Sequence, residues 1–279
     1  MPNRLKTYYT RTDCKMLRSL FVKHMQSIAN KGLPIRLLLS GGMDSLTILY
    51  ALVEADVPFS SYTFYFKDIP SSDKDMVERV HSKVAFDCNF VEFPSDWPSL
   101  QEDVIESIKI CRSLYNRIRE VKVETILAYM LLKKAIPDSV YQPVNGDETL
   151  FMYNRNDALW LARVGDTSPQ VQEARAGKFQ DKAEETAVFD NIISPYTDKG
   201  PVEKFLLGFS SGACNWRKPK SILYYAFEDY HTKCSSYRKP RPFQKASNEK
   251  AMFNRIAVDL GYKNALWLFK GVEQGDRPG

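Results

Sequence analysis

Residues 35–54, IRLLLSGGMDSLTILYALVE, decide the fold of this chain. The stretch begins with a short apolar run, which indicates a buried strand. Two glycines follow, and they allow a sharp turn and a close approach of the backbone to a ligand. Apolar residues then recur at Leu46, Leu49 and Val53, which is the spacing of one helix face. The stretch therefore predicts a strand, a tight turn and a helix.

The turn SGGMDS, residues 40–45, has the chemistry of an anion site. The N–H groups at a helix start and the positive end of the helix dipole attract phosphate oxygens, and Ser40 and Ser45 add hydroxyl groups. Asp44 would repel a bare phosphate, so its presence indicates a divalent cation between its carboxylate and the phosphate. No Gly-Lys-Ser/Thr follows the glycines, so this is not a Walker loop. An ordinary strand–turn–helix is the alternative.

SGGMDS resembles the pyrophosphate loop of the N-type ATP pyrophosphatases, the PP-loop superfamily. That superfamily includes asparagine, NAD and GMP synthetases and several tRNA-modifying enzymes. The resemblance implies an adenine nucleotide alpha hydrolase-like fold, and cleavage of ATP to AMP and pyrophosphate through an adenylated intermediate. It also implies nucleotide contacts from the first strand and its turn, at Leu39, Ser40, Gly41, Gly42, Asp44 and Ser45.

The composition is that of an ordinary globular chain. The 279 residues are 44% hydrophobic and 26% charged, and the net charge of +5 permits an anionic ligand without requiring nucleic acid. We find no apolar run long enough to span a membrane and no secretory signal, so no membrane partner is expected. The cysteines and histidines show no CxxC or zinc spacing, which favours free thiols and a cytoplasmic protein.

Strand and helix signals alternate after the first turn. Aromatic residues 59–66 indicate a second strand, Ser71 a helix start, and residues 89–93 a third strand. This alternation predicts an α/β fold with a parallel twisted sheet flanked by helices. Ligands bind such sheets at the carboxyl ends of strands. In the family that SGGMDS resembles, the end of the second strand holds adenine, which here implies Phe64.

Later segments are predicted with less regular patterns. Residues 99–136 are expected to be helical, with one apolar stripe through Val121, Thr125, Tyr129 and Leu132. The last 30 residues are expected to form a helix and then a strand or loop. We expect one domain, with a nucleotide-binding α/β core over 1–165 and a helical, basic part over 166–279.

A second acidic signal, NGDE, follows a short strand predicted over residues 140–144. Asp147 at the end of that strand could face Asp44 and complete a Mg²⁺ site. A solvated acidic loop is the alternative. The longer string NGDETLFMYN resembles an asparagine synthetase stretch. There Asp147 matches the acid that helps to hold magnesium pyrophosphate, and Gly146 joins the nucleotide site.

Three C-terminal segments extend the resemblance. SPYTD, residues 194–198, resembles a family stretch that precedes a helix, with Asp198 in a structural role and Pro201 at the helix start. KPKSILYYAF, residues 218–227, resembles the family's lysine-bearing helix, which implies that Lys220 is catalytic and neutralises charge on the α-phosphate. In YRKPRPF, Arg238 and Phe243 match a basic C-terminal segment of the family, although Pro240 replaces its middle lysine.

Together these segments resemble the synthetase domain of asparagine synthetase and of its β-lactam synthetase and lasso-peptide cyclase relatives. The resemblance implies an ATP- and Mg²⁺-dependent, AMP-forming carbon–nitrogen ligase that adenylates a small-molecule carboxylate and forms an amide with ammonia or an amine. The chain opens with Met1-Pro2, so no glutaminase domain is expected, and a separate amidotransferase subunit is one source of ammonia. Val144 replaces a family glutamate, which argues against asparagine as the product.

Two other functions stay open. Residues 217–250 hold nine Lys/Arg against three Asp/Glu, interleaved with aromatic residues, which is also typical of a nucleic-acid face. The protein could therefore adenylate or modify a nucleobase in tRNA or DNA. The third reading is a nucleotide-binding module without catalysis.

Overall fold

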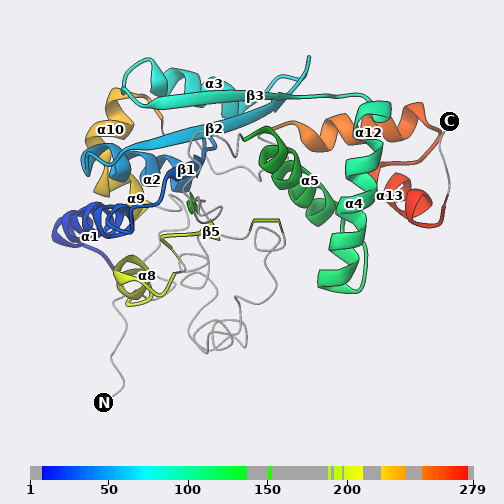
Figure 1. The fold of residues 1–279 in the computed structure, drawn as a ribbon. Helices are drawn as coiled ribbons and strands as arrows, with labels where there is room; N and C mark the ends of the chain where they lie inside the picture. The colour runs from blue at the N-terminus through cyan, green and yellow to red at the C-terminus, as the bar shows by residue number, and fades with distance from the viewer. Residues whose placement is uncertain are drawn as a thin grey trace.

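The computed structural model describes residues 8–136, 150–152, 188–189, 192–196, 198–209, 221–236 and 247–275. In these ranges it contains a five-stranded sheet in the order β3-β2-β1-β4-β5 (Figure 1). The strands are β1 (Ile35–Leu38), β2 (Phe59–Phe66), β3 (Asp87–Phe93), β4 (Leu150–Met152) and β5 (Ile192–Ile193). Every neighbouring pair is parallel, which confirms the predicted α/β fold.

Helices connect and cover the strands. The first three are α1 (Arg11–Ala29), α2 (Met43–Glu54) and α3 (Ser72–His81), and α4 (Trp97–Tyr115) and α5 (Glu120–Ala135) follow β3. The C-terminal part is helical, as predicted, with α8 (Pro201–Leu206), α9 (Ser221–Ala226), α10 (Glu228–Lys233), α12 (Glu249–Asp259) and α13 (Ala265–Glu273). None of the described helices is both long and apolar enough to cross a membrane.

Strand β1 is buried on both faces, because each face packs against a different group of helices. Leu37 and the following Leu39 join a core with α1, α2 and α9. Leu38 points into a second core with α4, α5, α12 and α13. Figure 1 shows these two groups of helices at opposite ends of the sheet. A parallel strand covered on both faces is apolar at nearly every position, which explains the Leu37-Leu38-Leu39 run, and Arg36 is the one charged residue of β1.

The order of the strands reverses at β1. Strands β2 and β3 extend to one side of it, and β4 and β5 extend to the other. Ile35 at the start of β1 lies opposite both Phe59 and Leu150. Ligands of open parallel sheets bind at the carboxyl ends of the strands beside such a reversal. The SGGMDS turn follows β1 directly, so the fold puts it at this point.

Two details of the sequence predictions are wrong. On the predicted helix α5, Leu132 of the expected stripe is buried but Val121 is 46% exposed, and the buried positions are Val123, Glu124, Ile126, Leu127, Ala128, Leu131 and Leu132. A wide arc is buried because α4, α13 and β3 all pack against α5. The strand or loop expected near the chain end is helix α13, which Asn264 caps by accepting the N–H of Trp267 at 3.2 Å.

The strand expected over residues 140–144 lies outside the described residues. On the side of β1 away from β2, the described strand is β4, and it follows Asp147 in the chain. The strand over residues 140–144 that leads into Asp147 therefore stays a prediction. The division of the chain at residue 165 stays a prediction, since residues 153–187 also lie outside the described ranges.

Candidate functional site

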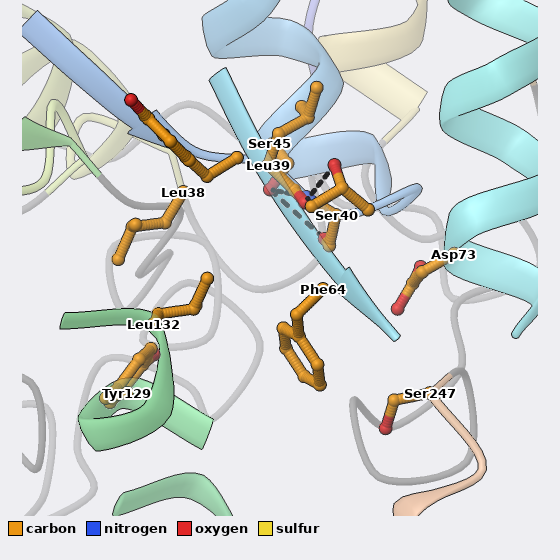
Figure 2. Close-up of a pocket in the computed structure, with 11 residues that line it drawn as sticks. Leu38, Leu39, Ser40, Ser45, Phe64, Asp73, Tyr129, Leu132 and Ser247 are labelled. Carbon is orange, nitrogen blue, oxygen red and sulfur yellow. Dashed lines mark hydrogen bonds between the residues drawn. The ribbon is translucent and has the colours of Figure 1, made fainter. Parts of the chain in front are cut away.

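The SGGMDS turn is held closed by bonds among its own groups. The backbone N–H of Ser40 donates to Ser45 Oγ at 3.2 Å, and the N–H of Gly42 donates to Ser40 Oγ at 3.3 Å. The two serine hydroxyls are 3.1 Å apart (Figure 2). The two serines predicted to contact phosphate therefore lie together, with their oxygens at the end of β1.

Asp73, in the first turn of α3, also bonds this turn, although the sequence analysis did not identify it. The N–H of Gly41 donates to Asp73 Oδ1 at 2.9 Å, and Asp73 is only 5% exposed. The carboxylate fixes the turn, and it also occupies an N–H that a phosphate oxygen would use. The only signal in the sequence was an acid shortly after the helix cap Ser71, where acids are common for electrostatic reasons alone.

Gly41 has no room for a side chain. A Cβ atom there would lie 2.6 Å from Met76 Cβ and 3.1 Å from the carbonyl oxygen of Asp73. At Gly42 the nearest atom would be the hydroxyl of Ser40, at 3.3 Å. The first glycine is therefore required by the close contact between the turn and α3, and the second glycine is less constrained.

Helix α2 starts with Gly42 as its N-cap, and no side chain caps it within the described part of the chain. This leaves the type of uncapped N-terminus that binds anions in other proteins. Asp44 lies in the first turn and is 7% exposed. Its backbone carbonyl accepts a hydrogen bond from the hydroxyl of Tyr196 at 3.0 Å. The SPYTD segment thus contributes a buried anchor for the start of α2.

A cavity of about 50 Å³ opens beside the turn. Its wall combines the ends of β1 and β2 with α2, α3 and α5 (Figure 2). The lining residues are Leu38, Leu39, Ser40, Ser45, Tyr62, Thr63, Phe64, Asp73, Tyr129, Leu132 and Ser247. The cavity therefore brings together four residues predicted to bind nucleotide, which are Leu39, Ser40, Ser45 and Phe64.

Phe64 gives the cavity an aromatic wall. Its ring stacks on Phe93, with centroids 5.2 Å apart and planes at 18°, and it meets Phe66 edge-on at 5.9 Å. Thr63 Oγ1 donates to the carbonyl of Leu39 at 2.9 Å, which joins the ends of β1 and β2. A planar ligand ring can stack on such a wall, since offset stacking is a favoured arrangement of aromatic groups.

Asp198 has the structural role predicted for it. Its Oδ2 lies 2.5 Å from Nε2 of His24 on α1, and its Oδ1 accepts the N–H of Gly200 at 2.9 Å. Helix α8 begins at Pro201, as predicted, with Gly200 as its cap. The carboxylate thus ties the start of α8 to α1, away from the cavity wall.

Gly146, Asp147, Lys220 and Arg238 lie outside the described residues, and their roles stay predictions. The helix expected after Lys220 is present, because α9 begins at Ser221. Within the ranges that the structure describes, no group of three or more His, Cys, Asp and Glu is arranged to hold a metal ion. The pairing of Asp44 with Asp147 around Mg²⁺ is therefore also still a prediction.

No family model matches the chain, and no curated protein matches it. Three solved structures are similar to it at a distance. A glutamine-dependent NAD+ synthetase from Acinetobacter baumannii, in complex with ADP, is 12% identical with a TM-score of 0.40, over 92% of this chain and 43% of that one. This chain thus spans less than half the length of that synthetase.

The other two are closer to this chain in length. A predicted subunit of tRNA methyltransferase from Methanocaldococcus jannaschii is 12% identical with a TM-score of 0.35, over 84% of this chain and 91% of that one. An NMN synthetase from Francisella tularensis is 13% identical with a TM-score of 0.37, over 84% of this chain and 99% of that one. These likenesses are too distant to assign a family or a reaction.

Proposed function

We propose that this protein is a PP-loop ATP pyrophosphatase that binds ATP at the carboxyl ends of β1 and β2 and forms AMP and pyrophosphate. The observation that carries the proposal is the single cavity that joins the SGGMDS turn to Phe64. ATP has an anionic end and a planar end. The cavity offers serine hydroxyls beside an uncapped helix start for the first, and an aromatic wall for the second.

The oxygen donors around the turn fit a hard divalent cation. The Asp44 carboxylate and the hydroxyls of Ser40 and Ser45 stand at the same helix start, and Mg²⁺ takes oxygen ligands together with substrate phosphates. With Asp147 these groups would hold Mg²⁺, which supplies positive charge to the departing pyrophosphate. Lys220 and Arg238 would add positive charge near the α-phosphate.

The reaction that this site would support is amide formation. A carboxylate oxygen of the substrate attacks the α-phosphorus of ATP, the bond to pyrophosphate breaks, and an acyl-adenylate forms. Ammonia or an amine then attacks the acyl carbon, which yields an amide, AMP and a proton. Ser40, Ser45 and the start of α2 hold the pyrophosphate, and Leu39 and Phe64 hold the adenine.

A second candidate keeps the ATP chemistry and changes the acceptor to a nucleobase in tRNA or DNA. The observation in its favour is the excess of nine Lys/Arg over three Asp/Glu in residues 217–250. Such an excess gives binding that weakens steeply as salt increases.

The test is nucleotide product analysis with ATP, Mg²⁺, ammonium and a panel of carboxylic acids that includes aspartate. We expect AMP and pyrophosphate with one acid, loss of both in Asp44→Asn, and retention in Asp56→Asn. Asp56 is the matched control because it follows the opposite end of α2 and its φ of 53° suits asparagine. AMP that appears only with tRNA or DNA would select the second candidate. No AMP under any of these conditions would refute both.

A further inference from the structure

Two buried carboxyl groups belong to α5 and α12, which the ion pair between Lys250 and Glu120 joins. Glu124 lies in the middle of α5, Glu249 opens α12, and both side chains are 0% exposed. Among the residues that the structure describes, none of their four carboxyl oxygens has a hydrogen-bond partner. Buried polar atoms are nearly always bonded in proteins, so four unbonded oxygens in one place need an explanation.

Lys250 is a cation near this pair in the described part of the chain, and it is engaged elsewhere. Lys250 Nζ lies 2.9 Å from Oε1 of Glu120, which is one turn before Glu124 on α5. Burial, and then the charge of Glu120, raises the pKa of Glu124 to about 8. Burial, and then the charge of Glu124, raises the pKa of Glu249 well above its usual range. A buried carboxylate pair of this kind takes up either protons or a cation.

The two segments that carry this pair also contribute residues to the wall of the candidate nucleotide cavity. The N–H of Glu249 donates to the hydroxyl of Ser247 at 3.4 Å, and Ser247 lines the cavity. Tyr129, a little more than one turn after Glu124 on α5, lines it as well. Asn248 fixes this end of α12, because its side chain donates to the carbonyl of Pro70 at 2.6 Å.

We propose that Glu124 and Glu249 bind a small cation that carries N–H groups, either the ammonium ion or the head of a small primary amine. An ammonium group donates hydrogen bonds in several directions, and two carboxylates offer four acceptor oxygens with compensating charge. Mg²⁺ and Ca²⁺ require about six to eight oxygen ligands, which two carboxylates do not supply.

A nitrogen donor at this place would serve the amide-forming reaction. One carboxylate takes a proton from the ammonium group, which leaves a neutral amine with a free lone pair and a carboxylic acid, and no other reactant is consumed. The assignment of the bound cation as the nitrogen substrate rests on the proposed function, whereas the binding itself does not.

The binding test measures the melting temperature by calorimetry at pH 8, without ATP. The samples contain ammonium chloride or methylammonium chloride, and the references contain tetramethylammonium chloride or potassium chloride at equal ionic strength. We expect ammonium to raise Tm by about 2 °C or more over both references. A similar rise with methylammonium would assign the head of a primary amine, and a rise with ammonium alone would assign the free ion.

Glu124→Gln/Glu249→Gln should abolish the rise, and Glu106→Gln on α4, whose exposed carboxylate pairs with Lys109, is the control that should keep it. Glutamine keeps the size of glutamate without a charge whose burial costs free energy, and the single variant Glu249→Gln provides the same test if the double variant does not fold. The proposal fails if the wild type shows no rise, if potassium gives an equal rise, or if the variants without the carboxylates keep it. Because ATP is absent, this outcome is independent of whether the protein makes AMP.

Discussion

Gly41 is the most constrained residue of the candidate site. Its N–H is bonded to Asp73, and the position of a Cβ is filled by Met76 Cβ at 2.6 Å. The string SGGMDS predicted a turn that approaches a ligand, and the described structure gives the first glycine a more specific reason, which is contact with α3. That contact could not be read from the sequence, because it joins residues 32 positions apart.

We predict that Gly41→Ala displaces the turn and destabilises the protein by about 1–3 kcal/mol, the usual cost of overpacking. ATP affinity should fall by at least tenfold. Gly42→Ala is the matched control, because its nearest neighbour is a hydroxyl at 3.3 Å that can rotate away. Urea unfolding and isothermal titration measure the two effects. Equal losses in both variants would contradict the role assigned to the contact with α3.

We predict that Asp73→Asn strengthens the binding of pyrophosphate several-fold when Mg²⁺ is absent. The Asp73 carboxylate competes with pyrophosphate for the N–H of Gly41 because it is a charged acceptor, whereas an asparagine side chain is neutral. The comparison is Asp75→Asn, since Asp75 lies in the same helical turn and is exposed. Titration calorimetry with pyrophosphate gives the affinities. Weaker binding in Asp73→Asn than in Asp75→Asn would refute this prediction.

At the scale of elements, the start of α2 is held by a segment far along the chain. Tyr196, just after β5, is fully buried and donates to the backbone carbonyl of Asp44. Tyr196→Phe removes this bond and leaves a buried carbonyl without it, so we expect a loss of about 1–3 kcal/mol. Chemical unfolding measures the loss. An unchanged midpoint would mean that the bond contributes nothing to stability.

The α5–α12 contact predicts a dependence of stability on pH. The pKa of Glu124 is raised by burial to about 8, whereas an unfolded glutamate has a pKa of about 4.3. Its contribution is therefore fully present below pH 4.3 and is lost as the pH rises through 8. The groups that face it are Glu120 on its own helix and Glu249 and Lys250 on α12.

We expect the wild type to lose more free energy of unfolding than Glu124→Gln/Glu249→Gln between pH 5 and pH 8.5 in tetramethylammonium buffers. Other titrating groups, such as the buried His231, are common to both proteins and cancel in the difference. Urea unfolding at several pH values gives the two curves. Parallel curves would contradict the buried, unpaired state of these carboxyl groups.

At the scale of the whole molecule, local signals were sufficient for the half of the sheet that β1, β2 and β3 form. The run before SGGMDS, the cap at Ser71 and the aromatic strand 59–66 each depend on neighbouring residues, and each is confirmed. Tertiary packing decided the rest. The wide buried arc of α5 includes Glu124, a residue type that helices usually place in solvent, and the packing of α4, α13 and β3 against α5 explains this arc.

The central claim is that one cavity holds both ends of ATP, and separate titrations with AMP and with Mg²⁺–pyrophosphate test it most directly. We predict that the wild type binds both ligands and that ATP displaces each. Phe64→Leu should weaken AMP by about tenfold and spare pyrophosphate, because base stacking contributes about 1–3 kcal/mol. Ser45→Ala should do the reverse. Failure of either ligand to bind, or equal effects of both substitutions on both ligands, would contradict the account.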